Sequence, residues 1–327
     1  MNMKPTAILS SNTDAVADSL SAMLKREQST FSCHDGYINF FTNSDPNMIT
    51  ADDRRALVDW CYGIVDHCMF CRETVASAME MVDRFLSVPS NSVDAARVSD
   101  EALRDRCKLQ LLTVAALYTS IKLNERVVLS SDVFAEMCSN LYTVEEIEGM
   151  ERTLLSGLSW RCRGPTARQI GMSILSLMSP FIDVPEVTWG FLIDEMVYLT
   201  EVAVRDYYFS TQRTSTIALS ATLLAIGDSS VQEYQLVLES FLRVIVETFD
   251  FESPALVAKA KMRLQSISKE NAENTDMEEV SVCQSTQTCK ASNISSSSRV
   301  LDGEAKKKKY ERGNVHQVSP NSSLSDL

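Results

Sequence analysis

The pattern of apolar and polar positions along the chain predicts an all-helical protein. The stretch LQLLTVAALYTSIK (109–122) is apolar on nearly every side, which is typical of a helix in the middle of a bundle. It is too short, and too often interrupted by polar residues, to cross a bilayer, which takes about 20 apolar residues. Strand-like alternation persists nowhere in the chain. We therefore expect residues 109–122 to form the central helix of an all-α fold.

Helical periodicity recurs on both sides of this stretch. In the first half of the chain the amphipathic segments are 14–27, 54–67, 72–86, 131–140 and 144–158. In the second half they run up to residue 178 and then over 186–206, 215–226, 232–249 and 255–267. Residues 89–105 are predicted to be a polar loop. The sequence thus predicts a short N-terminal helix followed by two tandem groups of five helices.

A helix stop separates the two groups. Gly164-Pro165 ends one periodic pattern, and Thr166 with Gln169 has the spacing of a capping box that opens the next. The composition becomes strongly polar after Ile267, and such a segment cannot bury enough apolar surface to offset its ordering entropy. We therefore divide the chain into an N-terminal segment, a first helical domain, a second helical domain and a disordered regulatory tail: 1–51, 52–163, 164–267 and 268–327.

The second domain contains a segment with weak sequence similarity to the central helix of the first. TVAALYTSIK (113–122) aligns with TIALSATLLA (216–225), which is the pattern of a repeated unit. In this alignment Lys122 falls opposite Ala225. The charged end of the helix is therefore expected in the first copy only.

Composition narrows the class of protein. The net charge of -13 argues against a nucleic-acid-binding surface, because phosphate contacts need a basic face. Nine cysteines at irregular spacing in a 327-residue chain do not resemble a disulfide framework. No secretory leader and no apolar run of membrane length are visible. We expect a protein of the nucleus and cytoplasm that contacts neither nucleic acid nor membrane.

Two local patterns are candidates for chemistry. Arg54 precedes an apolar helix face and Asp83 interrupts one, so the two charges are either a buried pair that joins two helices or two separate solvated charges. Cys68 and Cys71 form a CxxC. A structural zinc site would need a second matched pair, and a redox site would need a βαβ context. We expect these cysteines to pack a turn, and we expect neither a metal nor a cofactor.

Several segments in order resemble the helices of a cyclin box. They are RRALVDW (54–60), MVDRFLS (81–87), KLQLLTVAALYTSIKLNE (108–125) and EEIEGMERTLL (145–155). The similarity covers about 52–160, and DYYFSTQRTSTIALSATLLA (206–225) is more loosely similar to the second cyclin fold. The hallmark positions of the family match residue by residue as Arg54, Asp83, Leu111, Lys122 and Glu151.

The resemblance implies a role for each of these residues. Arg54 and Asp83 would form the internal salt bridge of the family, and Leu111 would belong to the core. Lys122 and Glu151 would pair with each other and bind the partner kinase, although a Lys–Glu pair at a surface is more often only a structural ion pair.

A substrate-docking patch is also implied by the resemblance. Leu57, Trp60 and Gln110 match it, whereas Asp53 stands where the family usually has Met and Gly63 where an acid is common. Trp60 as a simple core residue remains the alternative. The Leu-x-Cys-x-Glu segment of some cyclins does not occur.

The function implied is that of a cyclin, a non-enzymatic subunit that binds and activates a cyclin-dependent serine/threonine protein kinase in the cell cycle. A D-type-like or lineage-specific cell-cycle cyclin is preferred over a transcriptional one. A cyclin-fold transcription-associated scaffold is the alternative, and it would need basic surfaces. A redox enzyme would rest on the CxxC alone.

The tail carries short signal-like motifs. Lys269, Glu270 and Asn271 match a KEN degradation box through which a ubiquitin ligase would bind. The run Lys306, Lys307, Lys308 and Lys309 matches a nuclear import signal, although a charge run is often only a solvated tail. Ser319-Pro320 matches a site for a proline-directed kinase.

Overall fold

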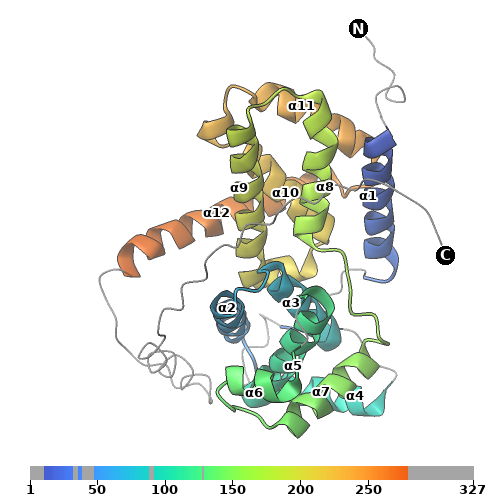
Figure 1. The fold of residues 1–327 in the computed structure, drawn as a ribbon, viewed down its shortest axis with the longest axis vertical. Helices are drawn as coiled ribbons and strands as arrows, with labels where there is room; N and C mark the ends of the chain where they lie inside the picture. Colours follow the sequence, from blue (N-terminus) through green and yellow to red (C-terminus); the bar gives the residue numbers. More distant parts are fainter. Residues whose placement is uncertain (1–10, 32–35, 39–47, 88–91, 127–128, 279–327) are drawn as a thin grey trace, which may run out of the picture.

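The computed structural model describes residues 11–31, 36–38, 48–87, 92–126 and 129–278, and every regular element among them is a helix. The prediction of an all-α fold is confirmed. The helices form two bundles, drawn one above the other in Figure 1, and each bundle has its own cluster of buried apolar side chains. We call the lower bundle, residues 51–157, the first repeat and the upper bundle, residues 167–278, the second repeat. The chain passes from the lower bundle to the upper one through Gly164 and Pro165.

The first repeat is built around the helix that the sequence singled out. Its elements are α2 (Ala51–His67), α3 (Glu73–Ser87), α4 (Val93–Ala102), α5 (Arg106–Asn124), α6 (Ser131–Met137) and α7 (Val144–Gly157). Every residue from Leu109 to Ile121 is buried, and α5 packs between α3 and α7. An all-round apolar surface requires this central place, because any exposed face would leave apolar area in water.

One predicted loop is wrong. Residues 89–105 contain α4, whose Ser92 side chain caps the N-terminus by accepting a hydrogen bond from the Ala95 N–H. Only Ala95, Val98 and Ala102 of this ten-residue helix are buried. These three positions form a stripe, but small apolar residues separated by charges make a weak periodic signal. Packing against α5 and α7 stabilises α4 as a helix.

The second repeat contains the five predicted helices. They are α8 (Ala167–Met178), α9 (Glu186–Arg205), α10 (Thr214–Ile226), α11 (Gln235–Thr248) and α12 (Pro254–Glu278), with short 3-10 turns at η2 (Ser179–Phe181), η3 (Tyr207–Thr211) and η4 (Ser229–Val231). The central helix here is α10, which contacts α8, α9 and α12. It is the segment that aligns with α5 in the sequence.

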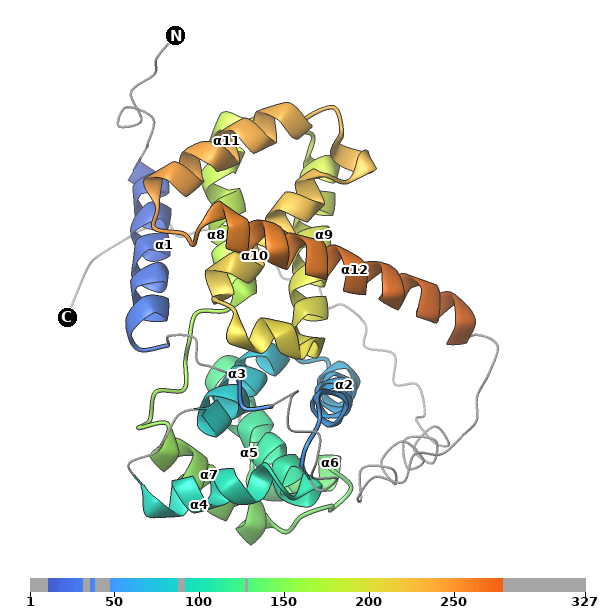
Figure 2. The same cartoon turned by 180° about the vertical axis from the view of Figure 1, so that it is seen from behind.

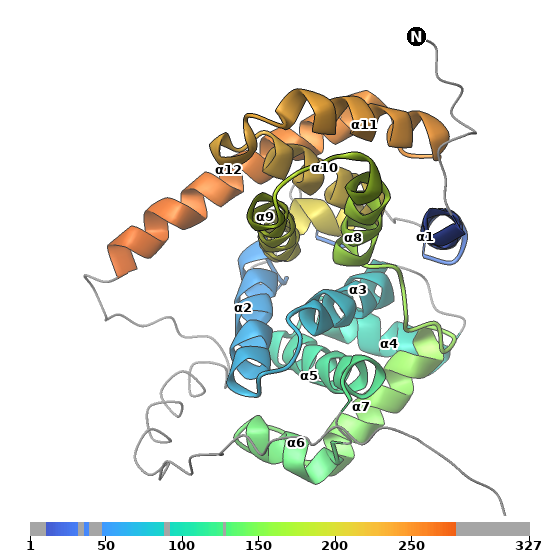
Figure 3. The same cartoon turned by 45° about the horizontal axis from the view of Figure 1, so that its top comes forward.

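The N-terminal helix α1 (Ser11–Ser29) belongs to the second repeat in space. Its Leu20 and Leu24 are buried in the apolar cluster of that repeat, and α1 lies beside α8 in Figures 1 and 3. The Glu27 carboxylate accepts a hydrogen bond of 2.7 Å from the Ser215 N–H at the start of α10. The N-cap of α10, Arg213, makes no side-chain cap bond, so α1 supplies it from a distant part of the chain.

The last helix is longer than expected. Helix α12 was predicted to end at residue 267 but continues to Glu278, and Figure 2 shows its final turns extending away from the bundle. The start of the tail predicted to be disordered is therefore helical, which polar helix-forming residues after Ile267 permit. The rest of that tail, 279–327, lies outside the described residues. No helix in the described ranges has the length and apolar character of a membrane span.

Candidate functional site

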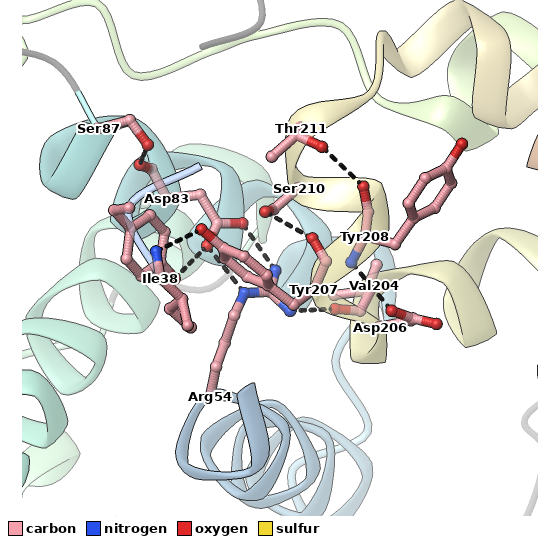
Figure 4. A network of polar contacts seen from close by, with 11 residues as sticks. Ile38, Arg54, Asp83, Ser87, Val204, Asp206, Tyr207, Tyr208, Ser210 and Thr211 are labelled. Carbon is pink, nitrogen blue, oxygen red and sulfur yellow. Dashed lines mark hydrogen bonds and ion pairs between the residues drawn. The ribbon is translucent and has the colours of Figure 1, made fainter. Parts of the chain in front are cut away.

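A buried ion pair lies where the two repeats meet (Figure 4). Arg54 on α2 donates from Nε to Asp83 Oδ1 at 2.8 Å and from Nη2 to Asp83 Oδ2 at 2.7 Å. Its remaining terminal nitrogen, Nη1, donates to the Val204 carbonyl on α9 at 2.7 Å. Arg54 is 3% exposed and Asp83 8% exposed. The structure thus brings together the two charges that the sequence left open as a pair or as separate surface groups, and it adds a bond to the second repeat.

The surroundings keep this pair charged. Burial on its own would lower the pKa of the Arg54 guanidinium, but the adjacent Asp83 carboxylate raises that pKa above its usual range. Tyr37 donates to Asp83 Oδ1 at 2.8 Å, and burial together with the Asp83 charge holds the pKa of its hydroxyl well above the ordinary value. Tyr37 therefore acts as a hydrogen-bond donor at any physiological pH.

The second pair, Lys122 and Glu151, lies at the outer end of α5. Lys122 Nζ is 2.6 Å from Glu151 Oε1 and 2.7 Å from Oε2. Glu151, on α7, is 9% exposed, whereas the Lys122 side chain is 37% exposed. The carboxylate is thus held inside the bundle, and the ammonium group faces solvent.

Two neighbours orient this pair. The Thr119 hydroxyl donates to Glu151 Oε1 at 2.8 Å, and Lys122 Nζ lies 4.1 Å from the centroid of the Tyr118 ring. An ammonium group has three donors and the pair does not occupy all of them. The geometry therefore presents a fixed cation to an acceptor on another molecule. Thr119 and Tyr118 were not predicted as part of this site, although their spacing from Lys122 places them on the same side of a helix.

The residues matched to a docking patch are mostly inside the first repeat. Leu57 and Gln110 are 7% and 2% exposed, and Trp60 is half-buried against the apolar cluster. Leu111, the expected core residue, is 8% exposed and belongs to that cluster. Trp60 Nε1 and Gln110 Nε2 are buried with no hydrogen-bond partner among the described residues. A buried donor without a partner costs about 1–3 kcal/mol.

Asp53 has a structural role at the position where an apolar residue was expected. Its carboxylate completes a capping box with Thr50 at the start of α2 and accepts a bond of 2.8 Å from Arg106 Nε. Burial raises the pKa of Asp53, but the hydrogen bonds from Arg106 and Thr50 outweigh it and the net pKa is lowered. The patch is therefore bordered by a charge that is already paired.

The remaining candidates are spread over the chain. Cys68 and Cys71 are free thiols at the α2–α3 turn, Cys68 half-buried and Cys71 exposed, and no cluster of three metal-ligating side chains occurs within the described ranges. Lys269 and Glu270 are exposed on α12, which also contains Asn271. The run Lys306–Lys309 lies outside the described residues.

Comparisons with known proteins agree with this fold. A family model described as "Cyclin, N-terminal domain" matches residues 18–163. Cyclin-A2-1 of Oryza sativa subsp. japonica is 27% identical over 177 residues, which cover 54% of this chain and 33% of that protein. The G2/mitotic-specific cyclin C13-1 of Daucus carota is 29% identical over 177 residues, which cover 54% of this chain and 47% of that protein.

A viral cyclin from Herpesvirus saimiri has a similar fold. Its TM-score is 0.50 at 14% sequence identity, over 67% of this chain and 87% of that chain. The chain spans between a third and a half of the length of the two curated relatives. Neither relative is named as D-type, so a D-type-like class stays a prediction.

Proposed function

Because this chain is a member of the cyclin family, we propose that it is a regulatory subunit that binds and activates a cyclin-dependent serine/threonine protein kinase in the cell cycle. In this role the chain performs no chemistry of its own. It acts in the nucleus and the cytoplasm, where such a kinase meets its substrates.

The observation that carries the proposal is the oriented Lys122–Glu151 pair. The Glu151 carboxylate is buried and receives donors from Lys122 and Thr119, so the ammonium group is fixed without losing its exposure. A cation fixed before binding loses little side-chain entropy when a partner arrives. Its spare donors fit acceptors on a protein surface, such as carbonyl groups at a helix C-terminus.

The mechanism is a shift of population in the kinase. Binding stabilises the state in which a mobile kinase helix brings its Glu to the ATP-orienting Lys and the activation segment opens. Moving a kinase from almost wholly inactive to almost wholly active takes roughly 5.5 kcal/mol of differential binding. One ion pair does not supply this amount, so exposed apolar side chains near the pair, such as Leu123, must contribute to the interface.

The half-buried indole of Trp60 supports a second contact of the same subunit. We propose that a substrate peptide with basic and apolar residues binds at this patch, against the exposed part of the Trp60 side chain. Replacing Trp60 with Phe should raise KM for substrates that carry such a motif and leave kcat unchanged, because docking away from the reacting atoms is uniform binding. An unchanged KM would mean that Trp60 is only a core residue.

The kinase proposal is tested by affinity capture of cell-cycle kinases followed by a histone phosphorylation assay. The wild-type chain is compared with Lys122→Ala/Glu151→Ala. The matched control is Arg97→Ala/Glu101→Ala, which removes another ion pair, the one on α4. Truncating a charged contact in an interface costs about 2–5 kcal/mol, so affinity should fall at least roughly thirtyfold in the test variant.

The controls decide how the results are interpreted. Circular dichroism must show that both double variants fold, since Glu151 is buried. Equal binding by the wild type and the test variant would move the interface elsewhere on the molecule. If the folded wild type captured and activated no kinase, the proposal would be abandoned in favour of a transcription-associated scaffold.

A further inference from the structure

A short segment between α1 and α2 lies at the junction of the two repeats. Residues 36–38 are described between two stretches that are not, and they contact both repeats. Toward the first repeat, the Tyr37 hydroxyl donates to Asp83 Oδ1 at 2.8 Å. Toward the second repeat, the Ile38 N–H donates to the Tyr207 hydroxyl at 2.7 Å, and the Tyr37 ring meets the Tyr207 ring edge to face with centroids 5.1 Å apart.

The contact is close enough to restrict residue 36. A Cβ at Gly36 would lie 2.7 Å from the Tyr207 hydroxyl oxygen and 3.2 Å from Thr211 Cγ2. Tyr207 is 5% exposed, so its rigid ring has little room to move aside. Glycine is therefore required here by the approach of the backbone to η3.

The same junction is bridged by Arg54, as Figure 4 shows. Its guanidinium donates hydrogen bonds to the Asp83 carboxylate of the first repeat and to the Val204 carbonyl of the second. Tyr37 donates to the Asp83 oxygen that also accepts from Arg54 Nε. The orientation of Asp83, and through it that of Arg54, thus depends on a side chain from the N-terminal segment.

We propose that residues 36–38 act as a clamp that fixes the angle between the two repeats, with Tyr37 as the positioning residue. Helix α1 is fastened to the second repeat by Leu20, Leu24 and Glu27. The clamp connects that helix to the first repeat, which carries Lys122 and Glu151. A partner that contacts both α1 and the Lys122–Glu151 pair therefore meets a surface whose two halves are held in register; this consequence rests on the proposed function.

The clamp is tested by measuring the distance between the repeats in the full chain. Nitroxide labels are attached to p-acetylphenylalanine introduced at Val93 and Leu236, which are 84% and 79% exposed and lie in different repeats. This chemistry leaves the native cysteines unlabelled. Double electron–electron resonance then gives the distribution of distances between the repeats.

The variants separate the hydroxyl, the ring and the backbone contact. Tyr37→Phe removes the hydrogen bond to Asp83, and Tyr207→Phe removes the acceptor of the Ile38 N–H. Gly36→Ala pushes the backbone at residue 36 away from Tyr207. The matched control is Tyr142→Phe, because the Tyr142 hydroxyl bonds to Gln110 and the Cys107 carbonyl within the first repeat. A hydrogen bond to a charged acceptor shifts an equilibrium by roughly tenfold or more, so the population outside the main peak should rise by that factor in Tyr37→Phe.

The outcome separates a clamp from a residue that only adds stability. Broader distributions in Tyr37→Phe, Tyr207→Phe and Gly36→Ala, with an unchanged distribution in Tyr142→Phe, support the clamp. A distribution in Tyr37→Phe that matches the wild type, in protein that is folded, overturns it. Kinase capture is measured separately, so a chain that binds no kinase while the distances respond to Tyr37 loses the proposed function and keeps the clamp.

Discussion

Replacing Arg54 with Met tests whether the buried ion pair joins the elements of the fold. The variant removes the two guanidinium donors to the Asp83 carboxylate and the guanidinium donor to the Val204 carbonyl. Among the described residues, Tyr37 is then the side chain that still donates to the Asp83 carboxylate. The Asp83 side chain is only 12% exposed, so water replaces the lost donors poorly. Removing one partner of a buried pair costs about 3–5 kcal/mol, because the other charge stays buried without compensation.

The double variant Arg54→Met/Asp83→Leu distinguishes this explanation from simple loss of packing. It removes both charges and replaces them with apolar volume, which is often neutral. The remaining cost comes from the Tyr37 hydroxyl and the Val204 carbonyl, which both lose their partner, at about 1–3 kcal/mol each. The double variant should therefore be more stable than Arg54→Met alone, and adding Tyr37→Phe should restore further stability.

The assay is urea unfolding followed by circular dichroism. With a slope of about 1–3 kcal/mol per molar urea, the midpoint for Arg54→Met should fall by at least roughly 1 M. A fall in free energy below about 1 kcal/mol would refute the reasoning, since the pair would then be solvated in solution. Additive costs in the double variant would refute it as well, because they would show that the two charges do not interact.

Three further predictions concern packing, pH and the N-terminal helix. Gly157→Ala should cost about 1–3 kcal/mol, because its Cβ would lie 2.5 Å from the Phe85 ring, whereas Gly63→Ala should stabilise by about 0.5–1 kcal/mol, since nothing lies within 4 Å; thermal unfolding of both variants checks this. Glu80 lines a cavity of about 150 Å³ between the repeats, and burial raises its pKa to about 7, against the opposing charge of Arg84. The folded state therefore holds this proton more tightly than the unfolded state, so this group's contribution to stability is full below the unfolded pKa and is lost as the pH rises through about 7. Unfolding as a function of pH should show that Glu80→Gln is more stable than wild type at pH 8 only; a constant difference at every pH would contradict this explanation. Glu27→Ala should cost about 1 kcal/mol and increase hydrogen exchange at the start of α10, because the helix loses its cap; unchanged exchange there would show that the cap does not operate in solution.

The sequence was sufficient where the chain's own pattern decides the structure. Periodicity placed α5 at the centre and located the other helices of both repeats apart from α4, because an apolar stripe must be buried whichever element covers it. It also placed Lys122 at the outer end of α5. The resemblance to cyclin boxes supplied the pairing of Lys122 with Glu151, since no local pattern connects two residues on different helices.

The missed features share one physical property: none of them has a strong apolar periodicity of its own. Helix α4 has a weak pattern and is stabilised by its neighbours, and the polar end of α12 was assigned to the tail. Tyr37 lies in a segment with no periodicity, so its contact with Asp83 could not be read from spacing.

The sequence by itself thus determined the helical class, the central helix and the position of the exposed cation. Only the tertiary structure decided that α1 belongs to the second repeat and that Arg54 reaches the Val204 carbonyl. Every residue carries a backbone carbonyl, so its use as an acceptor leaves no trace in residue type. Contacts across the junction of the two repeats depend on where whole bundles come to lie, and that placement results from many weak contacts rather than from any one motif.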